Sequence, residues 1–453
     1  MPVFLPDNPA KDDLLAGIPT LWLNPHLKHN DIADPGQRHR SSQVADAEAN
    51  WRRLAPLLQL LFPELESTGG LIQSALIEAE KLRDALGYRG PDYGRIFVKA
   101  DNDLPVAGSI KARGGVFEVF MFAEQLAREK GILTPEDSIT ALAQEEARTL
   151  FGHYTIAVGS TGNLGLSVGI AARSLGFKAV VHMSADAKQW KVDRLTRLGV
   201  KVVRHKADYT TAVEQARSDA EADPSIYFVD DECSELLFFG YSAAAKELAG
   251  QLAAAGVTVD ADHPLFVYLP CGIGGAPGGV TYGLKAIFGD NVHCFFVEPV
   301  QSPCAMVHMM SDSDELVSVY DAGLTNRTEA DGMAVARMSA FVAEAMRPIL
   351  AGIFTVADDD LFRWLWQAQD SQGIRLEPSA TASFAGPGFI VAGDQGRTFL
   401  AEQGLAARVA QAAHVLWTTG GAFVPQDQYA RFLERGAAIA EASARNPVSA
   451  NGE

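Results

Sequence analysis

The chain has 453 residues, of which 47% are hydrophobic and 21% are charged, a composition typical of a soluble globular protein with more than one domain. Its formal net charge of −18 argues against nucleic acid and anionic membranes as partners, because both are negatively charged. The four cysteines show no metal-ligand spacing, and neither a signal peptide nor a membrane-spanning apolar run is visible, which favours the cytoplasm.

Residues 1 to about 90 are expected to form helices and loops, for example over residues 46–62. From Arg95 onward, short β-branched segments alternate with segments of helical length, which predicts βαβ units around a parallel sheet. Helices are predicted over Asn163–Leu175 and Lys188–Leu198. The predicted strands lie near residues 96–100, 154–160, 178–183, 201–206, 225–230, 265–270 and 292–299.

The first candidate site is the turn Gly108–Gly115, with the sequence GSIKARGG. Small residues flank Lys111 in this turn, so its amine can approach a planar ligand, and a lysine amine forms a Schiff base with an aldehyde cofactor. For a lone lysine, the alternative is a solvated side chain near the start of a helix.

The second candidate site is the turn Gly159–Gly165, with the sequence GSTGNLG, between a predicted strand and a predicted helix. Backbone N–H groups at a helix N-terminus attract a carboxylate or a phosphate, and the amide of Asn163 can donate to a phenolate oxygen. The alternative is an ordinary helix cap, which Ser, Thr and Asn also favour.

The third candidate site is the segment Cys271–Gly279, with the sequence CGIGGAPGG, before a helix predicted to start near Val280. Its glycines allow several backbone N–H groups to approach a phosphate. Pro277 stands where a dinucleotide fingerprint starting at Gly272 needs glycine, and no Gly-Lys-Ser/Thr follows. A phosphate cradle without a nucleotide is therefore favoured over a purely structural turn.

Each turn is weak evidence alone, but the three follow predicted strands of one βαβ chain. A Schiff-base lysine, an anion-binding asparagine turn and a glycine-rich phosphate cradle together match the requirements of pyridoxal phosphate. The sequence therefore predicts a pyridoxal-phosphate site.

Segments along nearly the whole chain, from about Leu15 to about Pro425, resemble the bacterial D-serine dehydratase family of fold-type II pyridoxal-phosphate enzymes. The resemblance is carried by AGSIKARGG, VGSTGNLGLSVGI, PCGIGGAPGGVTYGLK, VEPVQSPC, ADGMAVARMS, RLEPSATA and VLWTTGG. It implies an α/β fold similar to the tryptophan synthase β subunit, with the cofactor in a cleft between two βαβ-type domains.

We expect three regions along the chain. Residues 1–145 would form a helical N-terminal region and the first part of the large domain, including the Lys111 turn. Residues 146–240 would form a smaller α/β domain with the Asn163 turn, and residues 241–453 the remainder of the large domain with the glycine-rich segment. No Pro- or Ser-rich linker is visible, so the smaller domain is expected to be joined by crossing connections.

The resemblance also implies which residues hold the cofactor. Lys111 matches the Schiff-base lysine and Asn163 faces the ring oxygen of the cofactor. Thr419 matches a hydroxyl residue beside the pyridine nitrogen, and a neutral group there suits elimination because the leaving group takes the electrons quickly. The phosphate cradle consists of Gly272, Gly274 and Gly275, followed by Ala276 where the family usually has a third glycine.

The implied reaction is loss of water from D-serine, with D-threonine as a further candidate substrate, to give a keto acid and ammonia in a monomeric enzyme. The substrate carboxylate would be held by Ser160, Thr161, Gly162 and Asn163. Lys111 and Thr161 are candidates for moving the α-proton, and Asp231 for protonating the leaving hydroxyl, unless Asp231 is simply a solvated loop carboxylate.

Three points stay open in the sequence. An L-serine or L-threonine dehydratase would use the same turns, and a non-catalytic cofactor-binding relative is disfavoured by the intact Lys111, Asn163 and glycine segment. Many relatives hold a monovalent cation near the phosphate cradle. Glu298, at the end of a predicted strand, is accordingly a candidate ligand for K⁺ or Na⁺ together with backbone carbonyls.

Overall fold

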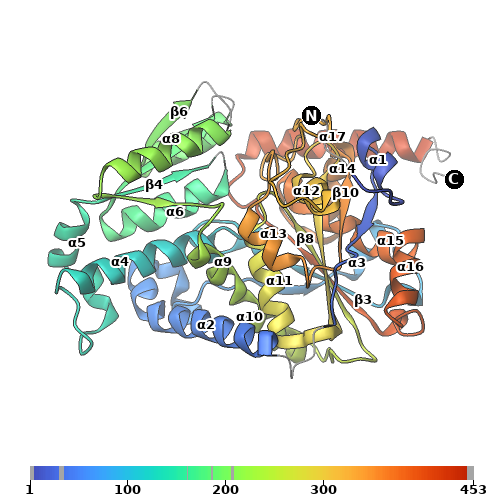
Figure 1. Ribbon diagram of the computed structural model, residues 1–453, viewed down its shortest axis with the longest axis horizontal. Coiled ribbons are helices and arrows are strands. Elements are labelled where there is room, and N and C mark those ends of the chain that lie inside the picture. Colours follow the sequence, from blue (N-terminus) through green and yellow to red (C-terminus); the bar gives the residue numbers. More distant parts are fainter. Residues whose placement is uncertain (1–4, 30–34, 161, 185–186, 206–208, 446–453) are drawn as a thin grey trace.

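The computed structural model describes residues 5–29, 35–160, 162–184, 187–205 and 209–445. Its strands form a seven-stranded sheet in the order β1-β10-β9-β8-β11-β3-β2 and a four-stranded sheet in the order β6-β5-β4-β7 (Figure 1). Helices cover both sheets, which confirms the predicted α/β class.

The central strands of the large sheet, β10, β9, β8, β11 and β3, are mutually parallel, and only the edge strands β1 and β2 are antiparallel. All pairs of the small sheet are parallel. The strand bounds are β1 Leu21–Leu23, β2 Leu76–Glu78, β3 Arg95–Lys99, β4 Thr155–Gly159, β5 Lys178–Ser184, β6 Lys201–His205, β7 Ile226–Val229, β8 Leu265–Pro270, β9 Val292–Pro299, β10 Gly352–Val356 and β11 Ala413–Trp417.

The small sheet and its covering helices α6 and α8 lie on the left of Figure 1, and the large sheet lies on the right. The helix bounds are α1 Lys11–Ala16, α2 Pro35–Leu61, α3 Glu80–Ala85, α4 Phe117–Glu129, α5 Glu145–Phe151, α6 Asn163–Leu175, α7 Gln189–Arg197, α8 Tyr209–Ala222, α9 Glu235–Ser242, α10 Ala244–Ala254, α11 Gly275–Phe288, α12 Cys304–Ser311, α13 Ala340–Met346, α14 Asp358–Gln372, α15 Gly386–Val391, α16 Asp394–Glu402 and α17 Gln426–Arg445.

Local sequence explains the elements next to the predicted turns. Helix α6 spans the predicted residues Asn163–Leu175 and ends at Gly176, whose φ of 100° few other residues adopt. Helix α11 begins at Gly275 rather than near Val280, so the expected position of its start is wrong. Pro277 is tolerated in its first turn because the backbone N–H groups of that turn have no partner within a helix.

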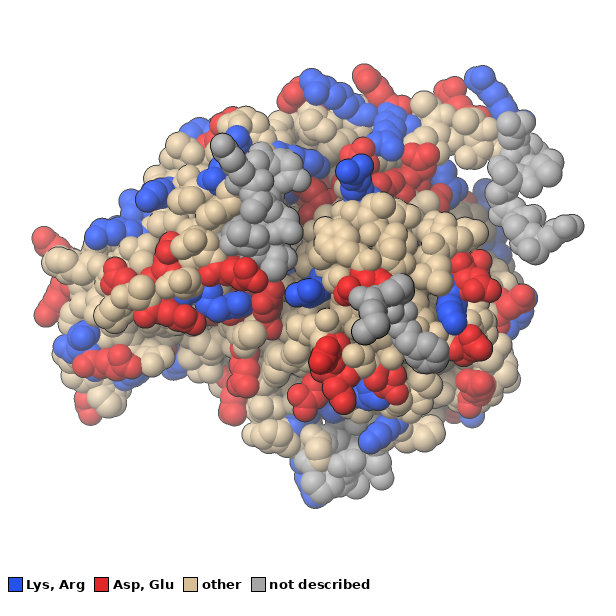
Figure 2. Space-filling view, turned by 45° about the horizontal axis from the view of Figure 1, so that its top comes forward, with Lys and Arg blue, Asp and Glu red and all other residues tan. Residues whose placement is uncertain are grey.

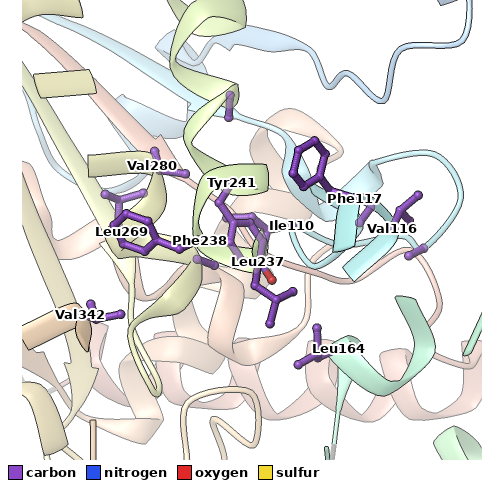
Figure 3. Packing of buried hydrophobic residues seen from close by; sticks show 14 of the residues in the cluster. Ile110, Val116, Phe117, Leu164, Leu237, Phe238, Tyr241, Leu269, Val280 and Val342 are labelled. Carbon is purple, nitrogen blue, oxygen red and sulfur yellow. The ribbon is translucent and has the colours of Figure 1, made fainter. Parts of the chain in front are cut away.

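A continuous apolar core joins the two sheets (Figure 3). Leu237, Phe238 and Tyr241 of helix α9 pack there with Ile110 and Phe117 of the segment around Lys111. A β-carbon at Gly114 would lie 2.4 Å from the ring of Tyr241, so only glycine lets helix α9 approach this segment so closely. The Lys111 turn is thus held by packing on its inner side.

Acidic and basic side chains are interspersed on the face of the molecule in Figure 2. Over the described residues, no helix is both long and apolar enough to cross a bilayer.

Candidate active site

A cavity lies where the segments that follow β3, β4, β7, β8 and β11 converge. The carboxyl ends of parallel strands are the usual position of a ligand site in open α/β sheets. The cavity brings together residues that the sequence predicts, and they are Lys111, Ser160, Gly162, Asn163, Asp231, Gly272, Gly274, Ala276 and Thr419. Thr161 lies outside the described residues.

Lys111 precedes a π-helical turn, Ala112–Val116, that leads into α4. Its side chain is partly exposed to the cavity, and its Nζ lies 5.7 Å from the centre of the Tyr241 ring. Two backbone contacts tie this turn to the segment after β11: Ile110 N–H donates to the carbonyl of Thr419 at 2.8 Å, and Ser109 forms a bridge with Gly420. The backbone that carries Lys111 is therefore held in place, and the amine of its side chain lies at the cavity.

A buried ionic cluster lies beside the same turn, and we call Lys99, Asp101, Arg113 and Glu247 the inner cluster. Arg113 binds both carboxylate oxygens of Asp101 at 2.8 Å and Oε2 of Glu247 at 2.7 Å. Burial alone would raise the pKa of Asp101, but the positive charges of Arg113 and Lys99 outweigh burial and lower this pKa. Because Arg113 is two residues from Lys111, the inner cluster anchors the turn that carries the amine.

Ser160 shapes the turn before α6. Its Oγ accepts hydrogen bonds from Gly162 N–H at 3.1 Å and Gly165 N–H at 3.0 Å, at the N-terminus of the helix. Asn163 directs its Nδ2 to Oε1 of Glu377 at 2.7 Å. The turn therefore presents a helix N-terminus and an amide to the cavity, the groups expected for binding an anion.

The glycine segment after β8 forms the opposite wall of the cavity. Gly274 has a φ of 107° and precedes the first turn of α11, where Gly275 and Ala276 lie. A β-carbon added at Gly272 would lie 3.2 Å from the carbonyl oxygen of Gly332. One added at Gly274 would lie 2.9 Å from Val342 Cγ1. Glycine is therefore needed at Gly274, whose φ is also positive, and a β-carbon at Gly272 would be a tight contact. The alanine at 276 occupies a helical position that accepts a side chain.

The hydroxyl residues after β11 have different environments. Thr418 is fully buried, and its Oγ1 bonds the carbonyl of Lys99 and Oδ1 of Asn102, both at 2.8 Å. Thr419 is partly exposed and lines the cavity. Of the two, Thr419 is the hydroxyl available to a ligand, although its contact with a pyridine nitrogen stays a prediction.

Asp231 follows β7 and also lines the cavity, so it is not a solvated loop carboxylate. Its Oδ1 is buried and, within the described residues, has no hydrogen-bond partner. Burial raises the pKa of Asp231, although the nearby charge of Lys111 partly opposes this effect. A buried polar atom without a partner is a common mark of a ligand-binding position.

Glu298 is buried and accepts hydrogen bonds from the backbone N–H groups of Ala305 and Met306, both at 2.8 Å, at the start of α12. Burial raises the pKa of Glu298 to about 8. In the part of the chain that the structure describes, no group of three or more His, Cys, Asp or Glu residues could hold a metal ion. Glu298 as a cation ligand stays a prediction.

A second ionic cluster faces the cavity, and sequence reasoning assigned no role to its members. We call Lys188, Lys191, Asp331 and Glu377 the cleft cluster. Asp331 and Glu377 both line the cavity. They belong to the ADGMA and RLEPSA segments, and the family resemblance of these segments is the only feature of the sequence that could have pointed to them. Lys191 Nζ lies 2.8 Å and Lys188 Nζ 3.3 Å from Oδ2 of Asp331.

These residues fit pyridoxal phosphate. The backbone N–H groups at the start of α11 and the glycine positions before it form a cradle for a phosphate group. Lys111 offers an amine to the same cavity, Asn163 an amide and Thr419 a hydroxyl. When bound there, the cofactor supplies an electron sink for chemistry at the α-carbon of an amino acid.

Comparisons with known proteins agree with this geometry. Residues 68–396 match the model of the family "Pyridoxal-phosphate dependent enzyme". The chain is 65% identical to a probable D-serine dehydratase of Sinorhizobium medicae, over 98% of this chain and 99% of that protein. It is 49% identical to a probable D-serine dehydratase of Pseudomonas aeruginosa, over 96% of this chain and 98% of that protein.

Solved structures show the same fold at low identity. Diaminopropionate ammonia lyase from Escherichia coli in complex with D-serine has a TM-score of 0.67 at 18% identity, covering 93% of this chain and 98% of that chain. Threonine deaminase isoform 2 from Solanum lycopersicum has a TM-score of 0.60 at 19% identity, covering 95% and 99%. The chain belongs to the family of pyridoxal-phosphate dependent enzymes, in the group whose members are named probable D-serine dehydratases.

Proposed function

We propose that the protein is a D-serine dehydratase that removes water from D-serine to give pyruvate and ammonia. The observation that carries this proposal is the convergence of Lys111, the Asn163 turn, the glycine cradle and Thr419 on one cavity. The names of its relatives support the substrate, and so does the solved complex of a structural neighbour with D-serine.

We assign the following roles in the reaction to the residues at the cavity. Lys111 Nζ would hold the cofactor, and its amine would move the α-proton, because it is a basic group that lines the cavity. The α6 N-terminus with Ser160, Thr161, Gly162 and Asn163 holds the substrate carboxylate. Asp231 delivers a proton to the departing hydroxyl, and its burial favours the protonated form that this role needs.

The deciding experiment measures keto-acid release from D-serine, D-threonine, L-serine and L-threonine under identical conditions. We expect D-serine to be the best substrate, with D-threonine turned over as well. Preferential turnover of either L-amino acid would instead identify an L-serine or L-threonine dehydratase. No release from any of the four would leave a non-catalytic cofactor-binding protein.

Lys111→Ala should abolish essentially all turnover and the absorbance band of the lysine-bound cofactor, because Lys111 is the only lysine among the described residues that line the cavity. Lys201→Ala, at an exposed position of β6, is a matched control that should keep both. Elimination activity retained by Lys111→Ala would contradict the assignment.

We further propose that the enzyme acts in the cytoplasm as a monomer, and that Glu298 with backbone carbonyls binds K⁺ or Na⁺. Sedimentation tests the monomer. Turnover in K⁺, Na⁺ and a bulky organic cation at equal ionic strength tests the cation site, and equal rates in all three would exclude it.

A further inference from the structure

The cleft cluster joins the two sheets across the active-site cavity. Lys188 and Lys191 lie at the start of α7, which packs on α6 beside the small sheet. Asp331 lies between α12 and α13, and Glu377 precedes β11, both on the side of the large sheet. Each of its short contacts therefore crosses from one side of the cavity to the other.

Lys191 is unusual because a lysine is rarely buried unless it is paired. Only 1% of its side chain is exposed. Burial alone would lower the pKa of Lys191, but the carboxylates of Asp331 and Glu377 outweigh burial and raise it. Lys191 is thus a permanent positive charge beneath the surface of the cavity.

This charge lies directly behind the turn that we assign to the substrate carboxylate. A β-carbon placed on Gly162 would lie 3.5 Å from Lys191 Nζ. The N–H groups of Gly162 and Gly165 already donate to Ser160 Oγ, and Asn163 already donates to Glu377. Several donors of the turn are therefore engaged, and a nearby cation adds attraction that the turn itself lacks.

The charges of the cleft cluster also suit an anionic ligand. Two carboxyl groups, Asp331 and Glu377, line the cavity and would repel a carboxylate if they stood alone. Burial raises the pKa of Glu377, whereas Lys191 and Lys188 outweigh burial and lower the pKa of Asp331 to about 2. The two lysines lie 2.8 and 3.3 Å from Oδ2 of Asp331, so their positive charges offset the repulsion between this carboxylate and an anionic ligand.

We propose that Lys191, anchored by Asp331 across the cavity, is a positioning residue that sets the preference of the Ser160–Asn163 turn for a substrate with a free carboxylate. It acts through the turn and not by contact, because the cavity is lined by Gly162 in front of it. This inference rests on the proposed function, since that function places the substrate carboxylate at the turn.

The test measures binding to the holoenzyme, with alanine and alaninamide as probes. Neither has a β-hydroxyl to lose, and they differ in the charge of the carboxyl group. Affinities are read from the change in cofactor absorbance, for D-alanine and D-alaninamide and for the L-pair. Wild type should prefer the acid over the amide.

In Lys191→Gln the affinity for D-alanine should fall by about tenfold, whereas that for D-alaninamide should change by less than about twofold. Lys191→Arg should restore part of the preference. Lys201→Gln removes the same charge from an exposed position of β6 in the small sheet and should leave the preference unchanged. An equal loss for acid and amide, or no loss for either, would overturn the proposal and leave Lys191 as a structural link.

A further variant covers the case in which Lys191→Gln does not fold because Asp331 loses its main partner. The double variant Lys191→Gln/Asp331→Asn removes both charges and replaces them with amides that can bond each other. Compared with Asp331→Asn alone, which keeps Lys191, the double variant should show the loss of preference for the acid, and an equal preference in these two variants would also overturn the proposal. Turnover of the four hydroxy-amino acids by wild type tests the proposed function separately, because the binding comparison requires no turnover.

Discussion

The inner cluster and the cleft cluster each contain two cationic side chains and two carboxyl groups, but only the cleft cluster contributes residues that line the active-site cavity. In the inner cluster Arg113 binds Asp101 through two parallel hydrogen bonds, and Ser74 and Trp417 add further donors to Asp101. All of its members belong to segments around the large sheet. The cleft cluster joins two sheets with fewer hydrogen bonds, and 25% of the Asp331 side chain is exposed.

The two clusters therefore differ in how rigidly they hold the residues around them. A buried, fully satisfied ion network fixes one geometry, since any displacement leaves a charge without a partner. It therefore suits the turn that carries Lys111, whose amine has to keep one position. A partly exposed network between two sheets can separate at a lower cost.

The largest expected effect is at Arg113. Arg113→Leu should lower the free energy of unfolding by about 3–5 kcal/mol, because it leaves the buried carboxylates of Asp101 and Glu247 without their main counter-charge. Urea unfolding of the purified protein measures the change. Arg52→Leu, which removes an exposed arginine paired with Glu48, should change stability by less than about 1 kcal/mol. Equal effects of the two substitutions would remove the distinction between a buried network and a surface ion pair.

An intermediate effect is expected at Asp331. Asp331→Asn should cost about 2 kcal/mol near neutral pH, since the two lysines lower the pKa of this carboxyl from 3.8 to about 2. A lowered pKa stabilises the fold above pH 3.8, and this stabilisation is lost as the pH falls through 2. The stability difference between wild type and variant should therefore shrink between pH 4 and pH 2. A cost larger than that of Arg113→Leu would reverse the comparison of the two clusters.

The smallest effect is expected at Ser74, whose hydroxyl donates to Asp101 Oδ1 at 2.6 Å and accepts from Lys99 Nζ at 2.6 Å. Ser74→Ala should cost only about 1 kcal/mol, because Asp101 keeps Arg113 and Trp417, and Lys99 keeps the Ser74 carbonyl and Glu247. Turnover should stay within twofold of wild type. A loss of turnover without a loss of stability would contradict this expectation. It would show that the inner cluster affects the Lys111 amine itself and does not only anchor its turn.

Most of the predicted residues that line the cavity could be found from the sequence because they lie in local turns. Lys111, Asn163 and Gly274 each lie in a short segment whose glycines and polar residues signal a special backbone. The same holds for α6, which ends where Gly176 adopts its left-handed conformation. By contrast, two inner strands of the large sheet, β10 and β11, are missing from the predicted set.

The pairs across the cavity could not be predicted in this way. Lys191 and Asp331 are 140 residues apart, and Asn163 and Glu377 are 214 residues apart. Nothing in the local sequence of either partner indicates the other, because the contact depends on how the two sheets are placed. The hydrogen bonds of Glu298 could not be predicted either. Its carboxylate caps α12, and its position at the end of a strand does not indicate this contact.

The position of β11 has a consequence for how the protein is made. This strand, formed by residues 413–417 near the end of the chain, lies between β3 and β8 in the middle of the large sheet. During synthesis, both neighbours expose an open edge until residues 413–417 emerge from the ribosome. Thr419 and the backbone bond to Ile110 follow directly after it, so a nascent chain has no complete cofactor pocket. Chains that terminate early therefore carry two apolar strands with one open edge each, which are a template for aggregation.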